Sequence, residues 1–549
     1  MTGIRRRDFC STLGLATVAS LANAAKPGTV GAESATVASP PPTSRQFGTI
    51  PPTKKMLFFD LWKLDYWDNV ELVQGTPEFV PEATYVDNTM PEKGAGKPSV
   101  FFDRDAGVWR MLYNIAWSPI RMMTAVSDDG IHWEPDPHPE IEIADEAAGG
   151  KKADHHIFTL PDAAAGGLYV DPVAKDGFPF KMYAQQGGKS VYQRALADSG
   201  HAWHKIATEE GVRRYFHEEL MLVSRDGLNW QTKRDYCWSR SDWHPEPPYF
   251  GFYNESLGRH CMIVRPGWGD RRVCMQTTSD FREWMEPELL FQMDPLDTAP
   301  VGFYTMPVIP YGHLFVGLLW VFHNASSRPV SSFNQFFGPM DAELTYSYDG
   351  VRFTRGKREP FLPLNPYPEH GCTQLRPYSM IEHGHEIRIY SGASRASHGR
   401  ERALNRQGHT AQAITMHRLR EDGFMYLRPR GDWARIQTKP LAVWSPEITL
   451  NASAPYGEVR YQITDEQSQP VEGFTFENCV PFQGEDQFDW TLSWKAANSS
   501  DLIGKVIRLE LEFQTANIYS LTAAYHFLDA QDQWMLKEGK QIDTSRFDY

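Results

Sequence analysis

Apolar and polar residues alternate in short runs along most of the chain from about residue 56. Runs such as residues 121–126, 219–223 and 343–346 are rich in apolar and β-branched residues and end at turn-forming residues. Short alternating segments bounded by Gly, Pro, Asp and Ser are typical of β-strands. The pattern therefore predicts an all-β fold.

A seven-residue segment recurs at the ends of these runs. It is SDDGIHW at residues 127–133, and related copies occupy residues 224–230, 278–284 and 347–353, with a degenerate fifth copy at residues 421–424. Asp-Gly forms a tight turn, because Gly accepts positive φ and Asp hydrogen-bonds nearby backbone. The aromatic residue three positions after the Gly site then lies on the returning strand. These residues are therefore predicted to shape the fold and not to carry chemistry.

The copies follow one another at irregular intervals of about 50 to 100 residues. Irregular repeats with room for four strands each predict a β-propeller. Five sets of four strands fit residues 56–441, and residues 56–60 would form a strand that closes the ring against the last blade. The innermost strands are expected near residues 97–102, 154–158, 243–249, 302–309 and from residue 374.

The character of the chain changes after residue 441. Residues 448–452, 458–463, 488–494 and 506–513 are alternating segments separated by turn residues. About a hundred residues of this kind predict a β-sandwich. We therefore expect a five-bladed β-propeller at residues 56–441 and a β-sandwich at residues 442–549.

The first 24 residues have the features of a twin-arginine-type signal peptide. Arg6-Arg7 precedes a short apolar stretch at residues 13–21, which ends in Ala22-Asn23-Ala24. Such a leader predicts export to the periplasm or the extracellular space. The apolar stretch is too short to span a bilayer, so we expect no integral membrane segment in the mature protein. Residues 25–55 are rich in Pro, Ser, Thr and Ala and predict a flexible linker.

Composition narrows the range of partners and cofactors. The net charge is −14 with a pI near 5.7, which argues against nucleic-acid or anionic-membrane partners. Five cysteines lie outside the leader, and no pair has the spacing of a metal site. We expect no cofactor, although histidines converging on the propeller axis could hold a metal ion. Hydrogen bonding to sugar hydroxyls is the alternative role for these histidines, and their spacing favours it.

Several segments resemble a known group of proteins. They are residues 57–61, 303–307, 318–323 and 340–341, and in the tail residues 450–452, 473–474, Cys479 and 509–511. Together they resemble exported bacterial glycosyl-hydrolase-like proteins with a five-bladed propeller and a C-terminal β-sandwich. This architecture is similar to that of the invertase/levanase and arabinanase/xylosidase clan, and the resemblance implies activity on glycosidic bonds. The Trp-Met-Asn-Asp-Pro-like start of blade one in invertases is absent, so fructosides are not the expected substrates.

Glycoside cleavage needs two carboxyl groups, one to protonate the leaving oxygen and one as nucleophile or base. In a propeller, such groups would lie where the innermost strands begin. We predict Asp154 and Glu246 as the principal pair, with Glu92 and Asp341 as further candidates. The candidate substrate-binding residues are His155, Trp243, His244, Tyr304, His323 and His370. For each of these carboxylates, a local salt bridge or turn remains the alternative role.

The sequence is consistent with two functions, one enzymatic and one limited to binding. The first is an exported glycoside hydrolase that acts on a poly- or oligosaccharide. The second is a non-catalytic glycan-binding propeller, and two carboxylates facing each other across a concave pocket would distinguish the first from the second. Sialidase chemistry is a third possibility, which would require Arg265, Arg376 and Arg395 to converge.

Overall fold

The computed structural model describes most of the 549-residue chain. The described residues are 52–89, 94–115, 120–143, 154–161, 163–200, 204–209, 217–236, 246–266, 271–297, 301–324, 337–398, 400–401, 404 and 410–544. The predicted signal peptide, almost all of the predicted linker, Glu92, Trp243 and His244 lie outside these residues.

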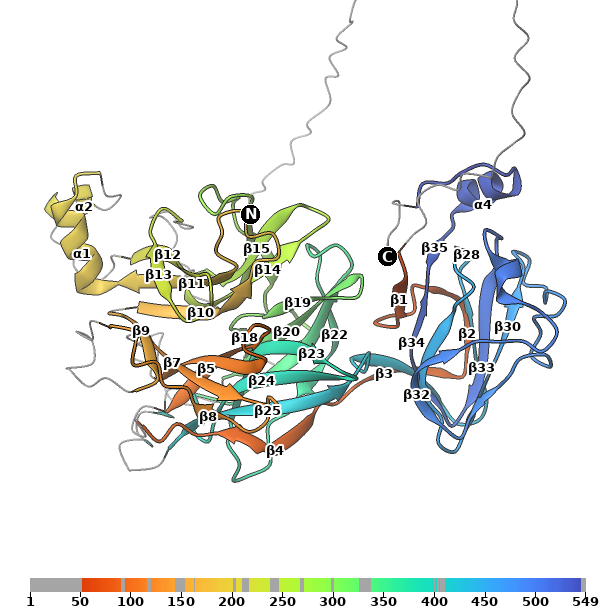
Figure 1. Cartoon of the computed structure of the whole chain (residues 1–549), viewed down its shortest axis with the longest axis horizontal. Helices are drawn as coiled ribbons and strands as arrows, with labels where there is room; N and C mark the ends of the chain where they lie inside the picture. Colours follow the sequence, from red (N-terminus) through yellow and green to blue (C-terminus); the bar gives the residue numbers. More distant parts are fainter. Residues whose placement is uncertain are drawn as a thin grey trace, which may run out of the picture. The chain divides into compact units, whose positions relative to one another are not determined.

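Four sheets form the five blades of a propeller, because β21 of blade four pairs with β23 of blade five and joins these two blades into one sheet (Figure 1). Blade one contains β5 (Ala95–Asp103), β6 (Val108–Ile115), β7 (Ile120–Ser127) and β8 (Glu134–Pro135), with β9 (His156–Leu160) also paired to β7. Blade two contains β10 (Ala163–Val170), β11 (Phe180–Gly187), β12 (His217–Ser224) and β13 (Trp230–Lys233). Blade three contains β14 (Glu246–Asn254), β15 (Arg259–Arg265), β16 (Val273–Thr278) and β17 (Glu288–Phe291).

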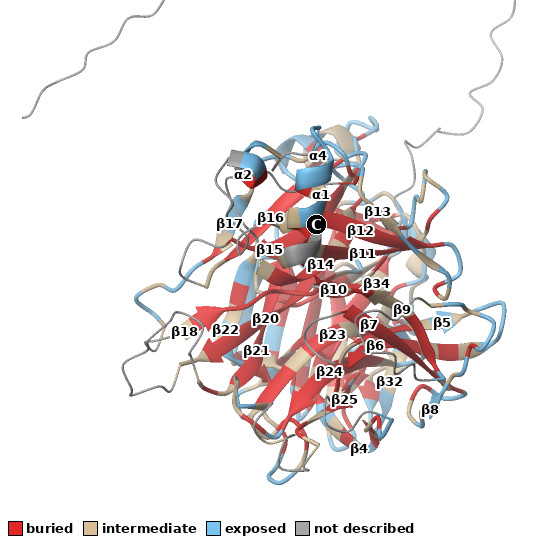
Figure 2. Cartoon of the chain, turned by 90° about the vertical axis from the view of Figure 1, so that its left-hand side faces the viewer, coloured by how far each residue is buried: buried red, intermediate tan, exposed pale blue. Residues whose placement is uncertain are grey.

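The two remaining blades are less regular. In blade four, β18 (Val301–Phe303) and β19 (Val308–Tyr311) share the innermost position beside β20 (Leu314–His323), followed by β21 (Met340–Ser347) and β22 (Thr354–Leu362). Blade five contains β23 (Gln374–His383), β24 (Glu386–Ser394), β25 (Gln412–Arg420) and β4 (Glu78–Tyr85). The innermost strands contact one another in order, since β10 touches β5 and β14, β14 touches β19, and β23 touches β5. The predicted five-bladed propeller is confirmed, and its strands are largely buried (Figure 2).

The ring is closed by a strand from the N-terminal side of the propeller. β4 precedes blade one in sequence but pairs antiparallel with β25 of blade five, with Tyr85 opposite Ile414 and Val80 opposite Met416. The prediction that residues 56–60 close the ring is wrong. Residues 54–57 form β1, which pairs with β34 of the second domain.

The innermost strand of blade two also differs from the prediction. Residues 154–158 do not begin that blade, because β9 pairs with the first half of β7 on the outer side of blade one. The innermost strand is β10, whose sequence AAAGGLYV has little β-propensity. A Cβ atom on Gly166 would lie 1.8 Å from the Tyr249 carbonyl oxygen, and one on Gly167 would lie 2.5 Å from the Phe250 ring. The close approach of β10 to β14 at the axis therefore requires glycine at these positions. Because of these glycines, the strand lacks the alternating pattern by which a strand is predicted.

The recurring turn has the predicted role and a second one. In blade one, Gly130 has a φ of 74° and donates its N–H to Ser127 Oγ at 2.9 Å, while Asp129 Oδ1 accepts the N–H of Ile131 at 2.8 Å. The copies at residues 224–230, 278–284 and 347–353 have the same arrangement.

Each turn also packs against the preceding blade. The Gly130 carbonyl accepts a hydrogen bond from Tyr390 of blade five at 2.7 Å, and the Asp349 carbonyl accepts one from Asn254 of blade three at 2.8 Å. Gly227 lies against Phe101 of blade one. The repeat therefore joins neighbouring blades as well as neighbouring strands.

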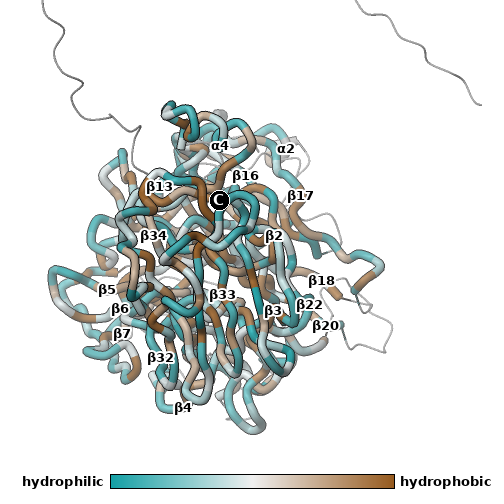
Figure 3. The backbone as a smooth tube through the Cα atoms, turned by 90° about the vertical axis from the view of Figure 1, so that its right-hand side faces the viewer, coloured by the Kyte–Doolittle hydropathy of each residue, from teal (hydrophilic) through white to brown (hydrophobic). Residues whose placement is uncertain are grey.

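The second domain is a β-sandwich built from both ends of the described chain. One sheet has the order β3 (Val70–Gln74), β26 (Met425–Pro429), β34 (Asn517–Ala523), β29 (Thr449–Ser453) and β32 (Asp486–Thr491), with β1 (Lys54–Leu57) on β34. The other has the order β2 (Leu64–Asp68), β27 (Ala434–Thr438), β33 (Arg508–Gln514), β30 (Glu458–Thr464) and β31 (Phe482–Gln483). Hydrophobic and hydrophilic positions alternate along its strands (Figure 3). The predicted boundary at residue 441 is displaced, because residues 54–74 and 425–443 pair within this domain.

A few shorter elements complete the described chain. They are α1 (Gly188–Ala197) and α2 (His204–Glu209) in the insertion of blade two, β28 (Leu441–Val443), β35 (Tyr525–Phe527), the 3-10 helix Ser499–Leu502 and α4 (Ala530–Lys537). No helix among the described residues is long and apolar enough to cross a membrane.

The degenerate fifth copy of the repeat lies where the chain leaves the propeller for the sandwich. Asp422, with 2% of its surface exposed, accepts hydrogen bonds from Tyr311 at 2.6 Å and Lys55 at 2.9 Å. It also accepts hydrogen bonds from Ser520 at 2.6 Å and Asn451 at 3.0 Å. Burial alone would raise the pKa of Asp422, but the charge of Lys55 and these hydrogen bonds lower it. One carboxylate thus connects blade four and blade five to three strands of the sandwich.

The docking of the turns can be tested with two glycine substitutions. Gly350 and Gly258 both have positive φ, but a Cβ on Gly350 would lie 2.5 Å from Asn254 Nδ2, whereas one on Gly258 would meet nothing within 4 Å. We expect Gly258→Ala to cost about 1 kcal/mol from backbone strain alone, and Gly350→Ala about 3 kcal/mol because the inter-blade contact is also lost. Denaturant unfolding measures both, and equal losses would show that the turn does not join the blades.

Candidate functional site

The polar residues of interest gather at the end of the propeller where the innermost strands begin. Glu246 is the first residue of β14 and lies opposite Arg265, the last residue of β15. The two side chains form a salt bridge. Arg265 is 4% exposed, whereas about a third of the Glu246 side chain is open to solvent. The predicted carboxylate Glu246 is therefore accessible and held in place by a buried cation.

Tyr304 links this ion pair to two further blades. The Arg265 guanidinium lies 4.4 Å from the centre of the Tyr304 ring, and that of Arg271 lies 5.0 Å from it. Arg271 also donates a hydrogen bond to the Tyr304 hydroxyl at 3.3 Å. On the other side, His398 Nε2 lies 2.5 Å from the same hydroxyl. Residues of blades three, four and five thus meet at one phenol ring.

A second carboxylate lies at the corresponding end of blade two, near the start of β12. Glu219, in β12, is 3% exposed, and its Oε1 accepts a hydrogen bond from Gln185 at 3.3 Å. The pKa of the Tyr249 phenol is raised well above its ordinary value, first by burial and then by the charges of Glu219 and Glu246. Tyr249 belongs to β14, the strand that Glu246 begins, and packs on Gly166 of blade two.

The innermost strands of blades one and five bring two cations together. Lys97, at the start of β5, donates a hydrogen bond to the Ala165 carbonyl of β10 at 3.0 Å. Burial, and secondly the charge of Arg376 in β23, lowers the pKa of Lys97 to about 7. The neighbouring residue of Ala165 is Gly166, which packs on Tyr249. Lys97 and Arg376 therefore belong to the same end of the axis as Glu246.

Asp341 and His323 form a pair at the same end of blade four. His323 Nε2 lies 2.9 Å from Asp341 Oδ2, and the hydrogen bond to Asp341 raises the pKa of His323. The His323 side chain is 37% exposed, whereas Asp341 is buried. Within the described chain, Asp341 Oδ1 has no hydrogen-bond partner. The two predicted residues are thus brought together, with the imidazole on the open side.

The other member of the predicted principal pair lies elsewhere. Asp154 is exposed and precedes β9 on the outer side of blade one, so the fold does not place it at the start of an innermost strand. His155 points into the protein, where its Nε2 lies 3.2 Å from Asp87 and 3.0 Å from the Tyr113 hydroxyl. Burial alone would raise the pKa of Asp87, but hydrogen bonds from His155, Tyr113 and Thr89 lower it to about 2. This buried network fixes the fold around blade one.

His370 is also buried, and its Nε2 donates a hydrogen bond to the Thr410 carbonyl at 3.1 Å. Burial lowers its pKa.

Arg395 lies near His370 and Cys372. Its charge adds to the lowering of the His370 pKa by burial, and at Cys372 it opposes the rise in pKa that burial causes. Of the three arginines considered for sialidase chemistry, Arg395 is therefore the one that these contacts do not link to the Glu246 cluster. Among the described residues, no group of three His, Cys, Asp or Glu side chains is arranged to hold a metal ion.

Comparisons with known proteins give a likeness of fold only. No family model and no curated protein sequence matches the chain. Solved structures similar to it include an N-acetylgalactosamine deacetylase from F. plautii in complex with blood group B trisaccharide (12% identity, TM-score 0.39, 65% of this chain and 97% of that one). Others are a thermostable family-43 glycoside hydrolase (12%, 0.37, 60% and 91%) and a GH43 β-1,3-galactosidase (10%, 0.35, 79% and 79%). At these values the function has to be argued from the site itself.

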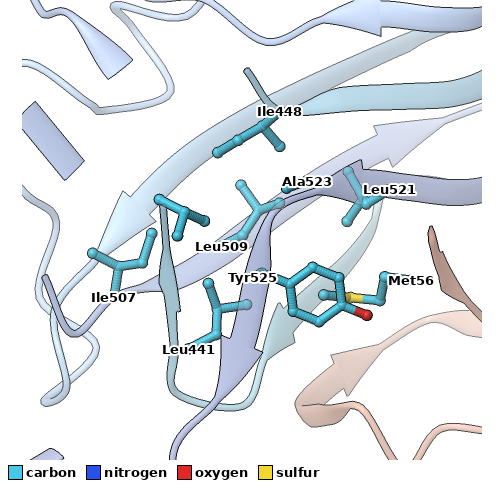
Figure 4. Close-up of a pocket in the computed structure, with 9 residues that line it drawn as sticks. Met56, Leu441, Ile448, Ile507, Leu509, Leu521, Ala523 and Tyr525 are labelled. Carbon is cyan, nitrogen blue, oxygen red and sulfur yellow. The ribbon is translucent and has the colours of Figure 1, made fainter. Parts of the chain in front are cut away.

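A separate cavity lies in the sandwich and has a different character. Its lining is apolar, with Met56, Leu441, Val443, Ile448, Ile507, Leu509, Leu521, Ala523 and Tyr525 around it (Figure 4). These residues belong to the hydrophobic core of that domain. The cavity offers no titratable group for catalysis except the Tyr525 phenol.

The buried network of Asp87 predicts an acid-sensitive step in stability. Since the pKa of Asp87 is about 2 when folded and about 3.8 when unfolded, its contribution is present above pH 3.8 and is lost as pH falls toward 2. At pH 7 we expect the free energy of unfolding of Asp87→Asn to be about 2 kcal/mol lower than that of the wild type. Between pH 5 and pH 3, the free energy of unfolding should fall less in Asp87→Asn than in the wild type. Asp105→Asn, at an exposed turn, is the control, and parallel pH profiles for Asp87→Asn and wild type would contradict the interpretation.

Proposed function

We propose that this chain is an exported glycoside hydrolase with its active site at the end of the propeller where the innermost strands begin. The observation that carries the proposal is the accessible carboxylate of Glu246, which buried Arg265 holds beside Tyr304, with a second carboxyl group, Glu219, at the same end of adjacent blade two. Two carboxyl groups placed around a glycosidic bond are what its hydrolysis needs. The twin-arginine motif of the leader supports the exported location.

The surroundings of the two carboxyl groups suit different roles. Glu246 is paired with Arg265 and partly open to solvent, so we assign it the carboxylate role, as nucleophile or as base for water. Glu219 is buried and hydrogen-bonded to Gln185, and we assign it the role of proton donor to the leaving oxygen. A water molecule then supplies the hydroxyl group to the anomeric carbon, and its proton returns to the carboxyl pair.

The remaining groups of the site suit a sugar ligand. Guanidinium, imidazole and phenol groups of Arg271, His398 and Tyr304 provide hydrogen-bonding atoms, and the Tyr304 and Phe322 rings lie 5.9 Å apart beside them. Sugar rings combine apolar faces with many hydroxyl groups, so sites of this mixed character recognise them well. The resemblance carried by residues 303–307 and 318–323 favours the same substrate class. Asp341 remains a further candidate through its pairing with His323.

Amide substitutions of the two carboxyl groups test the proposal. We expect Glu246→Gln and Glu219→Gln each to lower kcat by at least ~1,000-fold, because each removes a group that acts only in the chemical step. The measurement is hydrolysis of a panel of aryl-glycosides and polysaccharides by the mature protein, with circular dichroism to confirm folding.

Glu288→Gln is the matched control, because Glu288 is exposed on β17 of blade three. Hydrolysis that survives both substitutions would keep the enzyme and reject this carboxyl pair. Glycan binding without hydrolysis of any substrate would reject the enzyme and identify the chain as a glycan-binding propeller.

A further inference from the structure

Four cationic side chains gather at the mouth of the propeller in a chain of net charge −14. Blade three contributes Arg265 and Arg271, whose guanidinium groups both lie against the ring of Tyr304. Blades one and five contribute Lys97 and Arg376, which are close enough for the charge of Arg376 to act on the Lys97 amine. Cations concentrated against the overall charge of a protein raise the local concentration of anionic ligands.

Contacts through Ala165, Gly166 and Tyr249 connect the two pairs of basic side chains. Lys97 Nζ donates to the Ala165 carbonyl, and the next residue, Gly166, packs against the Tyr249 backbone. Tyr249 in turn lies within the electrostatic influence of Arg265 and Glu246. Arg265 and Arg271 therefore lie next to the proposed catalytic carboxylate, and Lys97 and Arg376 lie near the starts of β5 and β23, at the same end of the axis.

Arg265 has more hydrogen-bond donors than the described residues satisfy. One of its nitrogens, Nη2, donates to Glu246. In the described part of the chain, its Nε and Nη1 are buried and have no hydrogen-bond partner. Buried N–H groups without partners are costly, and a guanidinium group can donate two parallel hydrogen bonds to a carboxylate or a phosphate. Arg271, which is only partly buried, stands beside it on the Tyr304 ring and extends the cationic surface towards solvent.

We propose that the mouth of the propeller recognises a uronic acid residue, whose carboxylate is held by Arg271 and Arg265, with Arg376 adding to the positive field. This inference rests on the proposed function and names its substrate class, an acidic poly- or oligosaccharide. Charged hydrogen bonds of this kind discriminate strongly, because a neutral analogue leaves the guanidinium groups without their partner.

The test measures binding and does not require hydrolysis. The probes are disaccharides of galacturonic, glucuronic, mannuronic and guluronic acid joined through sulfur, which resist cleavage, each compared with its methyl ester. We expect at least one acid to bind the wild-type protein at least ~10-fold more tightly than its ester by calorimetry. Equal affinities for every acid and its ester would overturn the proposal.

Two substitutions and a control locate the recognition. Arg271→Gln and Arg376→Gln are each expected to weaken binding of the preferred acid by about 10-fold and to weaken binding of its ester by less. Arg259→Gln, at the opposite end of β15 from Arg265, should change neither. Arg271 is partly exposed, so Arg271→Gln decides the matter if Arg376→Gln fails to fold.

The outcomes separate this inference from the proposed function. A preference for the acid that survives in Arg271→Gln and Arg376→Gln would overturn the assigned residues. Tighter binding of sulfated neutral disaccharides than of any uronide would overturn the carboxylate. Loss of hydrolysis in Glu246→Gln with no acid preference would leave the hydrolase standing and reject only its acidic substrate.

Discussion

The pairing of β4 with β25 is the interaction on which the rest of the propeller depends. A ring of blades has a common axial mouth only when its first and last blades are joined, and here the join is a strand that precedes blade one and completes blade five. Because the ring is closed, the starts of β5, β10, β14 and β23 meet around one axis. The turns at Gly130 and Asp349, each docked on the preceding blade, hold that ring at its opposite rim.

The two domains are joined by two crossings of the chain and by a buried carboxylate. β1, β2 and β3 lie in the sandwich before the chain enters the propeller at β4, and β26 and β27 return it there. At the second crossing, Asp422 accepts hydrogen bonds from both domains. Removing one partner of such a buried set typically costs several kcal/mol. The sandwich therefore stabilises the strand that closes the ring, by fixing the chain just before it.

The sequence was informative wherever a local rule determined the structure. The recurring Asp-Gly turn follows from backbone geometry, so it revealed the propeller. Glu246 and Tyr304 followed from the expected innermost strands, and His323 and Asp341 from the connection between the second and third strands of blade four. Asp154 was misplaced because β10 needs Gly166 and Gly167 for close packing and so lacks an alternating pattern. Glu219, Arg271 and His398 were missed because their contacts join different blades, and no spacing along the chain signals that. Lys97 opens a strand that was predicted, and its position at a strand start was the available signal.

We propose that one end of the propeller, around Glu246, Arg265 and Tyr304, binds and cleaves a glycan. A crystal structure of the Glu246→Gln protein soaked with the oligosaccharide that the wild type degrades best is the decisive test. We expect a sugar ring beside residue 246, with its scissile oxygen within hydrogen-bonding distance of Glu219 and a substituent on Arg271. A sugar bound only to the sandwich, or at the rim formed by the Asp-Gly turns, would contradict it.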